Sequence, residues 1–424
     1  MIALDQPLAA RIGLDWADAH HDVSLQETGS DTIERRRIRH TPEALVEWIT
    51  ELRARFGNRP VVGVCVELSR GPLIHALLEH DFIVLFPVNP VSLKRFREAF
   101  VPSGAKDDPP DADFLLELLT KHPDRLRSWK PDDPKTRTLG RLVEARRKAV
   151  DLRTRLTQWL RAELKGYFPQ ALEWTGKELI SSLACDFLLK WPTLEAVQRA
   201  RPETVRTFYY GHNCRRGDLI EERLKDIRLA KPLTTDPAII DPSVLTVQML
   251  ARQIRALGPS IDQYEEEIDK IMATHPDAEL FQCLPGAGPV MAPRLLAAFG
   301  SDRERFESAI EIQQLSGIGP VTKRSGKKTV VHWRLAAPTF LRQSFHEFAG
   351  LSIQKSAWAR AYYDLQRERG KNHHAAVRAL AFKWIRILYR CWQDRTPYDE
   401  GRYIQALIRR GSPLAQRFQL AAAA

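Results

Sequence analysis

The sequence has few cysteines, no long apolar run and no basic leader, and each of these absences excludes a class of protein. Its five cysteines are widely scattered and never form a C-x-x-C arrangement, so neither a disulfide framework nor a zinc site is indicated. The longest apolar runs, such as residues 61–66, are far shorter than the roughly 20 residues of a membrane-spanning helix. The N-terminal stretch lacks the basic region of a secretory signal. We therefore expect a soluble, cytoplasmic protein with reduced thiols and no membrane partner.

Positive charge, in contrast, is present in excess. Of 424 residues, 64 are Lys or Arg and 53 are Asp or Glu, which gives a formal net charge of +11. Such a surplus favours association with a polyanion, although it carries no information about the fold. The hydrophobic fraction of 44% is enough to fill real cores. The composition therefore predicts a globular, multidomain protein whose partner is a nucleic acid, with a membrane surface as the weaker alternative.

Residues 8–130 show the pattern of a mixed α/β domain. Three strands joined by short turns come first, and strand–helix units follow them. The unbroken apolar run of residues 61–66 predicts a strand that is buried on both faces of a sheet. The predicted strands are residues 11–15, 21–27, 32–40, 61–67 and 82–87. This order resembles the layout of ribonuclease-H-like (Holliday-junction-resolvase-like) domains, in which the first and fourth strands are neighbours.

Acidic residues stand at the points where this layout brings strands and a helix together. Asp15 and Glu67 end the first and fourth predicted strands, so we expect them side by side. Asp108 and Asp111 lie three positions apart at the start of the next helix and project from one face. Carboxylates are preferred Mg²⁺ ligands, and four of them suffice for two ions that serve the attacking and leaving oxygens of phosphoryl transfer. Taken singly, each acid is an ordinary surface charge; the combination in this chain order favours a metal site.

The middle region, residues 131–275, predicts two long helices with coiled-coil spacing. The first helix, about residues 135–167, repeats apolar residues at alternating spacings of three and four: Leu142, Ala145, Ala149, Leu152, Leu156 and Trp159. The second repeats Val247, Leu250, Ile254, Leu257, Ile261, Tyr264, Ile268 and Ile271, with a kink expected at Gly258-Pro259. Two interpretations stay open: the helices pack on each other within one chain, or they also join protomers. Residues 179–241 predict several short helices with starts marked by Pro192 and Pro202, and the role of residues 170–243 cannot be assigned.

The C-terminal domain, residues 276–410, is predicted to be mostly helical and to contain two glycine-rich turns. Gly286 and Gly288 precede a helix, and Gly317 and Gly319 repeat the pattern downstream. Both turns resemble helix-hairpin-helix motifs, whose exposed backbone N–H groups bind a phosphate. Two simple Gly-Pro helix breaks are the alternative interpretation.

A basic segment with a single serine follows the second turn. Ser325 stands next to a glycine among cationic residues, and further arginines follow it. The residues expected to contact nucleic acid here are Lys323, Arg324, Lys327, Lys328, Arg334 and Arg342. Chemistry alone favours Ser325 as a hydroxyl that contacts a phosphate, with the cations stabilising developing negative charge.

The combined motifs resemble those of the DEDD transposases of the IS-one-ten insertion-sequence family, relatives of the Piv invertases. The acidic part of the resemblance lies in Gly13-Leu14-Asp15, Val66-Glu67 and Lys106-Asp107-Asp108-Pro109-Pro110-Asp111-Ala112. The C-terminal part lies in the glycine-rich turn, Ser325-Gly326 and the Leu341-Arg342 helix. The resemblance implies that Asp15, Glu67, Asp108 and Asp111 form a Mg²⁺-binding tetrad. It also implies that Ser325 is the nucleophile that links to a DNA end, with Ser316 as the second candidate.

The family resemblance also implies partners. It predicts donor and target double-stranded DNA, recognition of both by a structured guide RNA, and a homodimer or homotetramer. Two other functions remain open from the residues alone. One is a resolvase-like, metal-dependent endonuclease that forms no covalent intermediate, and the other is a non-catalytic nucleic-acid-binding protein that uses only the glycine-rich turns.

Overall fold

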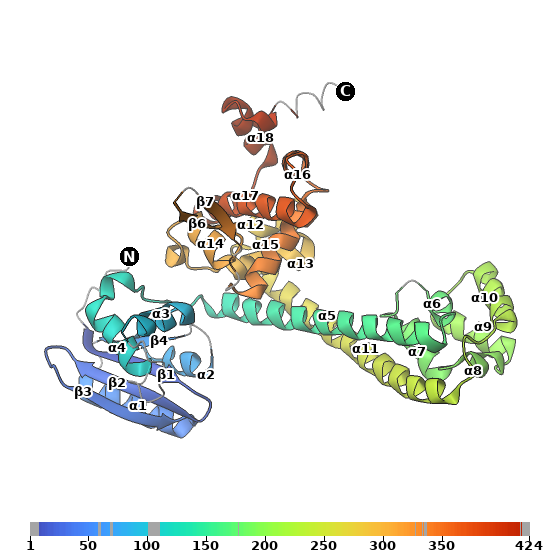
Figure 1. The fold of residues 1–424 in the computed structure, drawn as a ribbon, viewed down its shortest axis with the longest axis horizontal. Helices are drawn as coiled ribbons and strands as arrows, with labels where there is room; N and C mark the ends of the chain where they lie inside the picture. Colours follow the sequence, from blue (N-terminus) through green and yellow to red (C-terminus); the bar gives the residue numbers. More distant parts are fainter. Residues whose placement is uncertain are drawn as a thin grey trace. The chain divides into compact units, whose positions relative to one another are not determined.

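The chain folds into two compact units, residues 1–132 and residues 133–424. The computed structural model describes residues 8–57, 61–67, 71–100, 111–176, 178–326, 328–332, 334, 337–415 and 417. The first unit is a mixed sheet with helices, and the described residues of the second unit form helices and one β-hairpin (Figure 1). Within the described part of the chain, every helix falls short of the length or the apolar character that a bilayer crossing demands.

A five-stranded sheet of order β3-β2-β1-β4-β5 forms the centre of the first unit. Strands β1 (Leu8–Trp16), β2 (His20–Glu27) and β3 (Ile33–Arg39) pair antiparallel. Strands β4 (Val61–Val66) and β5 (Ile83–Pro87) continue the sheet from β1 in parallel. The predicted neighbourhood of the first and fourth strands is confirmed. It explains the apolar sequence of β4, because a strand between two others with covered faces has no solvent side.

Helices cover both faces of this sheet, because its apolar residues alternate between them. Helices α1 (Pro42–Phe56) and α2 (Pro72–Leu77) pack on the face that carries Ile12, Val62 and Val64. Helices α3 (Pro90–Phe100) and α4 (Asp111–Lys121) share a smaller core with Cys65 and Phe86 on the other face. A short 3₁₀ turn, η1 (Pro123–Arg125), follows α4. The unit is therefore a three-layer α/β/α arrangement.

Two long helices, α5 (Pro134–Tyr167) and α11 (Pro237–Met272), pack along each other in the second unit (Figure 1). Helix α11 continues through Pro242 and Pro259 without ending. The predicted contact line of α5 is partly wrong, because Leu152 and Trp159 are 38% and 50% exposed. In this half of α5 the buried leucines are Leu156, Leu160 and Leu164, which share a core with α11 and a group of short helices.

The short helices between α5 and α11 form a core of their own with the adjoining parts of both long helices. Fully buried Phe187 and Tyr209 lie at its centre, close to Trp191 and Phe208. The expectation of several short helices is confirmed, and proline starts α9 as predicted. They are α6 (Ala171–Trp174), α7 (Ser182–Lys190), α8 (Leu194–Gln198), α9 (Pro202–Gly211) and α10 (Gly217–Leu229).

The C-terminal part of the second unit surrounds the buried tryptophans Trp358, Trp384 and Trp392. Leu139 of α5 and Ile268 of α11 belong to the same core, so the long helices are rooted in it. The elements are α12 (Ala278–Gln282), α13 (Gly288–Phe299), η2 (Arg303–Arg305), α14 (Ala309–Leu315), β6 (Val321–Ser325), β7 (Lys328–His332), α15 (Thr339–Ser352), α16 (Ala357–Glu368), α17 (His373–Gln393) and α18 (Glu400–Arg409).

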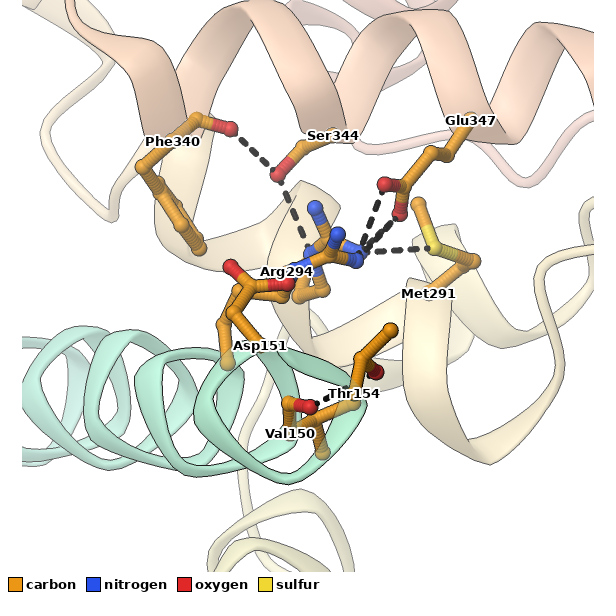
Figure 2. Close-up of polar contacts among 9 residues, drawn as sticks. Val150, Asp151, Thr154, Met291, Arg294, Phe340, Ser344 and Glu347 are labelled. Atoms are coloured by element: carbon orange, nitrogen blue, oxygen red, sulfur yellow. Dashed lines mark hydrogen bonds and ion pairs between the residues drawn. The ribbon is translucent and has the colours of Figure 1, made fainter. Parts of the chain in front are cut away.

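A buried arginine joins α5, α13 and α15 where the long helices enter this core. Arg294 is 3% exposed, and its Nη1 lies 2.5 Å from a Glu347 carboxylate oxygen. Its Nε donates to Ser344 Oγ at 3.2 Å (Figure 2). Arg147 of α5 lies 2.9 Å from the same Glu347 carboxylate. Burial lowers the pKa of Arg294 while Glu347 acts in the opposite direction, so the guanidinium depends on this carboxylate.

Candidate active site

Helix α4 lies directly on β1 because the strand has a glycine at the contact. A Cβ atom on Gly13 would stand 1.9 Å from the carbonyl oxygen of Ala112 and 2.4 Å from the backbone nitrogen of Leu116. No side chain fits at such distances, so only glycine permits this approach. Asp111, the first residue of α4, is thereby held near Asp15 in the last part of β1. The Gly-Leu-Asp sequence thus combines a packing residue with a candidate catalytic residue.

Asp15, Glu67 and Asp111 gather at one edge of the sheet. The parallel pairing of Leu14 with Val66 brings the ends of β1 and β4 together, so Asp15 and Glu67 follow neighbouring strands. Burial raises the pKa of Asp15 to about 6, with further contributions from the negative charges of Asp111 and Glu67. Repulsion of this kind indicates carboxylates that lack sufficient positive charge between them. The sheet therefore brings together three of the four predicted acids, and Asp108 lies outside the described residues.

Arg97 of α3 was not anticipated from the sequence, and it contacts this cluster directly. Its Nη1 donates to both carboxylate oxygens of Asp111, at 2.9 and 3.1 Å. A hollow of about 270 Å³ opens beside this pair, and its lining includes Glu67, Asp111, Arg97 and Lys94. No local pattern would have found Arg97, because its contact depends on how α3 and α4 meet. The hollow thus offers both acidic and basic groups to a ligand.

The donor set fits a hard divalent cation. All the candidate ligands are carboxylate oxygens, which Mg²⁺ and Ca²⁺ prefer, and no soft sulfur or imidazole ligand is part of the cluster. In the described ranges, no three His, Cys, Asp or Glu side chains stand close enough to ligate one ion. Arg97 occupies Asp111 instead, so a bound cation would have to displace it or share that carboxylate. Asp15, Glu67 and Asp111 therefore supply the donor type that such a cation prefers, but the side chains would have to move closer together, and Arg97 away from Asp111, before the three could ligate one ion.

Ser325 ends the first strand of a small antiparallel hairpin. Strands β6 and β7 pair with Ser325 opposite Lys328, and Gly326 begins the turn at φ +56°. Lys323 and Arg324 precede the serine on β6, while Lys327 lies outside the described residues. Sequence reasoning missed these strands. The available signal was the β-branched residues on both sides of a short glycine-containing turn.

Ser316 and the second glycine-rich turn have a different role from the predicted one. Ser316 is fully buried, and its hydroxyl donates to the Gln313 carbonyl at 3.3 Å. The Gly319 N–H also donates to that carbonyl, at 2.7 Å, and Gly317 adopts φ +69°. The turn therefore closes α14, and β6 follows it. The helix implied by the repeated pattern is wrong, because residues 321–325 instead pair with residues 328–332 as a β-hairpin.

The first glycine-rich turn does precede a helix, as predicted. Gly286 and Gly288 have φ values of +85° and +54°, and Gly288 begins α13. A Cβ atom on Gly286 would come within 3.1 Å of the Leu351 backbone, so close packing on the end of α15 also requires glycine there. Gly288 and the following Pro289 are exposed. The start of α13 is thus open to solvent.

The two remaining predicted contacts lie near the hairpin and on α15. Arg334 is half-buried, and its carbonyl oxygen lies 3.2 Å from the position of a Cβ atom on Gly317. Arg342 on α15 is half-buried close to Arg378 of α17. Burial, together with the charge of Arg342, lowers the pKa of Arg378 to about 10. Positive charge is therefore concentrated on this side of α15.

Comparison with known proteins matches the region of the acids and the region of Ser325 to one family. Residues 12–169 match the transposase family DEDD_Tnp_IS110, and residues 278–364 match the Transposase IS116/IS110/IS902 family. The chain is 28% identical over 410 residues to the mini-circle putative transposase for IS117 of Streptomyces coelicolor, covering 95% of this chain and 99% of that protein. It is 34% identical over 215 residues to the putative transposase y4uE of Sinorhizobium fredii, covering 49% and 57% of the two chains. It is 26% identical over 396 residues to an uncharacterized protein of insertion element IS110 of Streptomyces coelicolor, covering 92% and 95%. The chain therefore belongs to the IS110 (IS-one-ten) family of insertion-sequence transposases and is an enzyme of DNA transposition.

Proposed function

We propose that the chain cuts and rejoins DNA through a ribonuclease-H-like centre formed by Asp15, Glu67, Asp108 and Asp111, with Ser325 as the nucleophile. One observation carries this proposal: Asp15, Glu67 and Asp111 gather where β1, β4 and α4 meet. The strand order of the sheet is the one that ribonuclease-H-like domains use, which supports the same conclusion. The fourth acid, Asp108, joins the proposal through the sequence motif alone.

The acids have a defined task in this proposal. They would hold Mg²⁺, two ions per site, whose bound charge lowers the cost of negative charge on the reacting phosphate. Asp15 is half-buried among other carboxylates, which favours neutralisation by a cation over solvation by water. Arg97 is suited to hold Asp111 in place until the cation arrives, because its two hydrogen bonds fix the carboxylate.

Ser325 would carry out the covalent step. Its hydroxyl oxygen would form a bond to the scissile phosphorus as the bond to the leaving DNA oxygen breaks, and that oxygen would take up a proton. A hydroxyl of a second DNA end would then attack the serine-linked phosphate and restore the serine. Lys323, Arg324 and Lys328 on the two strands of the hairpin would offset the negative charge of the phosphate. The burial of Ser316 favours Ser325 over this second candidate.

The same proposal includes the partners. Donor and target double-stranded DNA would be the substrates, and a structured RNA would guide the chain to them in the cytoplasm as a homodimer or homotetramer. The formal charge of +11 supports polyanion binding in general. The exposed start of α13 supports a phosphate contact at Gly286 and Gly288. Gly317 and Gly319 would contribute only through the position they give to β6.

Trapping the covalent intermediate tests this function. The full chain would be incubated with Mg²⁺, DNA that flanks its coding sequence and the RNA transcribed from that DNA, and adducts would be separated on a denaturing gel. Wild type should form a protein–DNA adduct, whereas Ser325→Ala and Asp15→Asn should form none. Ser316→Ala is the matched control for the serine. Asp22→Asn is the matched control for the acid, because Asp22 lies opposite Asp15 on β2 and pairs with Arg37.

Two outcomes would overturn the proposal in different ways. Mg²⁺-dependent cleavage without any adduct, unchanged in Ser325→Ala, would indicate a resolvase-like endonuclease that uses the same acids with water. Nucleic-acid binding without cleavage or adduct in wild type, unchanged in Asp15→Asn, would indicate a protein that only binds nucleic acid.

A further inference from the structure

A hollow of about 570 Å³ lies between α17 and α18, and cationic side chains dominate its polar lining. Helix α17 contributes Lys383, Arg386 and Arg390, at successive turns of one face. Helix α18 contributes Arg402, and Arg410 follows the last residue of this helix, about two turns further on. We call this hollow the α17–α18 groove. None of its lining residues belongs to the acid cluster or to the Ser325 hairpin.

The groove has a defined shape because α18 is fixed to the start of α16. One carboxylate oxygen of Glu400 accepts hydrogen bonds from Ser356 Oγ at 3.0 Å and from the Ala357 N–H at 2.9 Å. The Tyr403 ring packs against Trp358, with ring centroids 4.9 Å apart. These contacts fix α18 to α16, and the arginines of α17 and α18 line the same hollow.

Much of the positive charge in the groove is not neutralised by the protein. Arg390 and Arg402 are each 3.5 Å from an aspartate, Asp394 and Asp399 respectively. Among the residues for which the structure gives positions, no carboxylate forms an ion pair with Arg386, Arg410 or Lys383.

Lys383 is held by aromatic rings instead. Its ammonium nitrogen lies 4.7 Å from the centre of the Tyr362 ring. Burial, and then the charge of Arg386, lowers the pKa of Lys383. An anion in the groove would relieve this repulsion.

The floor of the groove is apolar and aromatic, which narrows the class of ligand. Ile387, Leu407, Tyr398 and Tyr403 line it beneath the cations. A second hollow of about 620 Å³ lies on the other side of Arg386 and Arg390 and is lined by Phe382, Tyr389 and Ile310 among others. Arginine stacks on planar groups and also pairs with phosphate, so an arginine ridge between two apolar hollows suits a chain of planar groups joined by phosphates.

We propose that the α17–α18 groove binds unpaired nucleotides, with phosphates on Arg386 and Arg410 and a base against the apolar floor at Ile387 and Tyr403. Duplex bases are stacked on each other and cannot reach this floor, whereas unpaired ones can. The inference rests on the proposed function in one respect, namely that the chain acts on nucleic acids. It adds a site for single strands, whether these belong to RNA or to melted DNA.

Binding of short strands by the full chain tests this site. Fluorescence anisotropy would be measured with three labelled probes: single-stranded RNA, single-stranded DNA and duplex DNA. Each probe would be about 12 nucleotides long, a length in the range that single-strand sites cover. The test variant is Arg386→Gln with Arg410→Gln. The matched control is Arg369→Gln with Arg409→Gln. Arg369 lies at the end of α16 and Arg409 on α18, and both are exposed but do not line the groove. Circular dichroism would confirm that both variants fold.

The expected result follows from counterion release. Each lost single-strand phosphate contact makes the slope of log K against log salt shallower by about 0.7, so two contacts cost about 1.4 in slope and roughly 25-fold in affinity near 0.1 M salt. The control should keep the wild-type slope, and duplex binding should change little in either variant. A preference for RNA over DNA would identify contacts to the 2′-hydroxyl, and equal binding would identify the shared phosphate and base chemistry.

Three results would overturn the inference. The first is an equal loss of affinity in the test and control variants. The second is an equal loss of duplex and single-strand binding in the test variant. The third is a cross-linking experiment in which a strand with photoreactive uridine, bound to wild type, reacts only with residues outside 383–410. Strand binding is measured without Mg²⁺ or cleavage, so these failures leave the roles of Asp15 and Ser325 untouched. Conversely, if Asp15→Asn and Ser325→Ala still formed the adduct, the proposed function would fail while the result of this binding test would be unaffected.

Discussion

Replacing Glu347 by alanine should destabilise the second unit strongly, because it leaves Arg294 buried without its counter-charge. Arg294 is 3% exposed and makes its short ion pair with Glu347 between α13 and α15 (Figure 2). Ser344, the Met291 sulfur and the Phe340 ring are its other partners, and all three are neutral. Neither can replace the carboxylate, so the guanidinium would keep its charge in a setting that disfavours it.

The expected magnitude comes from the burial of the two partners. Removing one member of a buried pair costs about 3–5 kcal/mol. The Glu347 side chain is 33% exposed, so solvent screens part of the interaction and the lower end applies, about 3 kcal/mol. Replacing both residues, Arg294→Met with Glu347→Leu, removes both charges and should cost only about 1 kcal/mol, because Arg147, the other partner of Glu347, keeps its ion pair with Asp151. The double variant should therefore be more stable than the single one.

Urea unfolding followed by tryptophan fluorescence would measure these free energies in a double-mutant cycle. Glu195→Ala is the matched control, because Glu195 pairs with Arg199 on an exposed helix surface and should matter by less than about 1 kcal/mol. A loss below about 1 kcal/mol in Glu347→Ala, or a double variant as unstable as the single one, would refute the reasoning.

Three further predictions concern single positions. Gly13→Ala should lift α4 off β1 and lower the unfolding free energy by about 3 kcal/mol, seen as a lower thermal midpoint, and a shift under about 1 kcal/mol would contradict the close packing. Arg395→Gly should raise the thermal midpoint, since Arg395 has φ +50° after α17 and a left-handed side-chain residue costs about 1 kcal/mol; an unchanged midpoint would count against strain there. Burial raises the pKa of Asp133, but hydrogen bonds from Thr136 and Ser301 outweigh it and lower the pKa from 3.8 to about 2. Its carboxylate therefore stabilises the fold above pH 3.8 and loses this effect as the pH falls towards 2, so Asp133→Ala should cost about 1 kcal/mol at neutral pH and progressively less in acid.

Local sequence patterns predicted the sheet of the first unit well, because each strand carries its own signal. The apolar run of β4 and the short turns between β1, β2 and β3 are visible in a few residues each. Once the strand order is known, the meeting of Asp15 and Glu67 follows from the pairing of Leu14 with Val66. The contact of Arg97 with Asp111 does not follow from it, because it depends on how two helices pack.

In the second unit, patterns predicted the helices but not the face that each one buries. Spacing placed Trp159 inward, whereas Leu160 and Leu164 are buried in its place. A long helix that contacts a partner helix at one end and a cluster of short helices at the other buries different faces along its length. A uniform repeat therefore predicts the wrong buried residues in part of the helix. Gly317 and Gly319 show the same limit: a glycine-rich turn can start one helix or close another, and the choice depends on whether the next residues form a helix or a strand.

The rooting of α11 in two separate cores has a mechanical consequence. Ile268 lies in the C-terminal core and Val247 in the core of the short helices, and at 1.5 Å per residue the 36-residue helix is about 54 Å long. Helix α5 runs beside it and also contributes residues to both cores. The two helices should therefore move together as one rigid element and not bend at a hinge between the cores. A force applied to the short helices, for example by a bound partner, would act through a long lever arm on the part of the chain that carries Ser325.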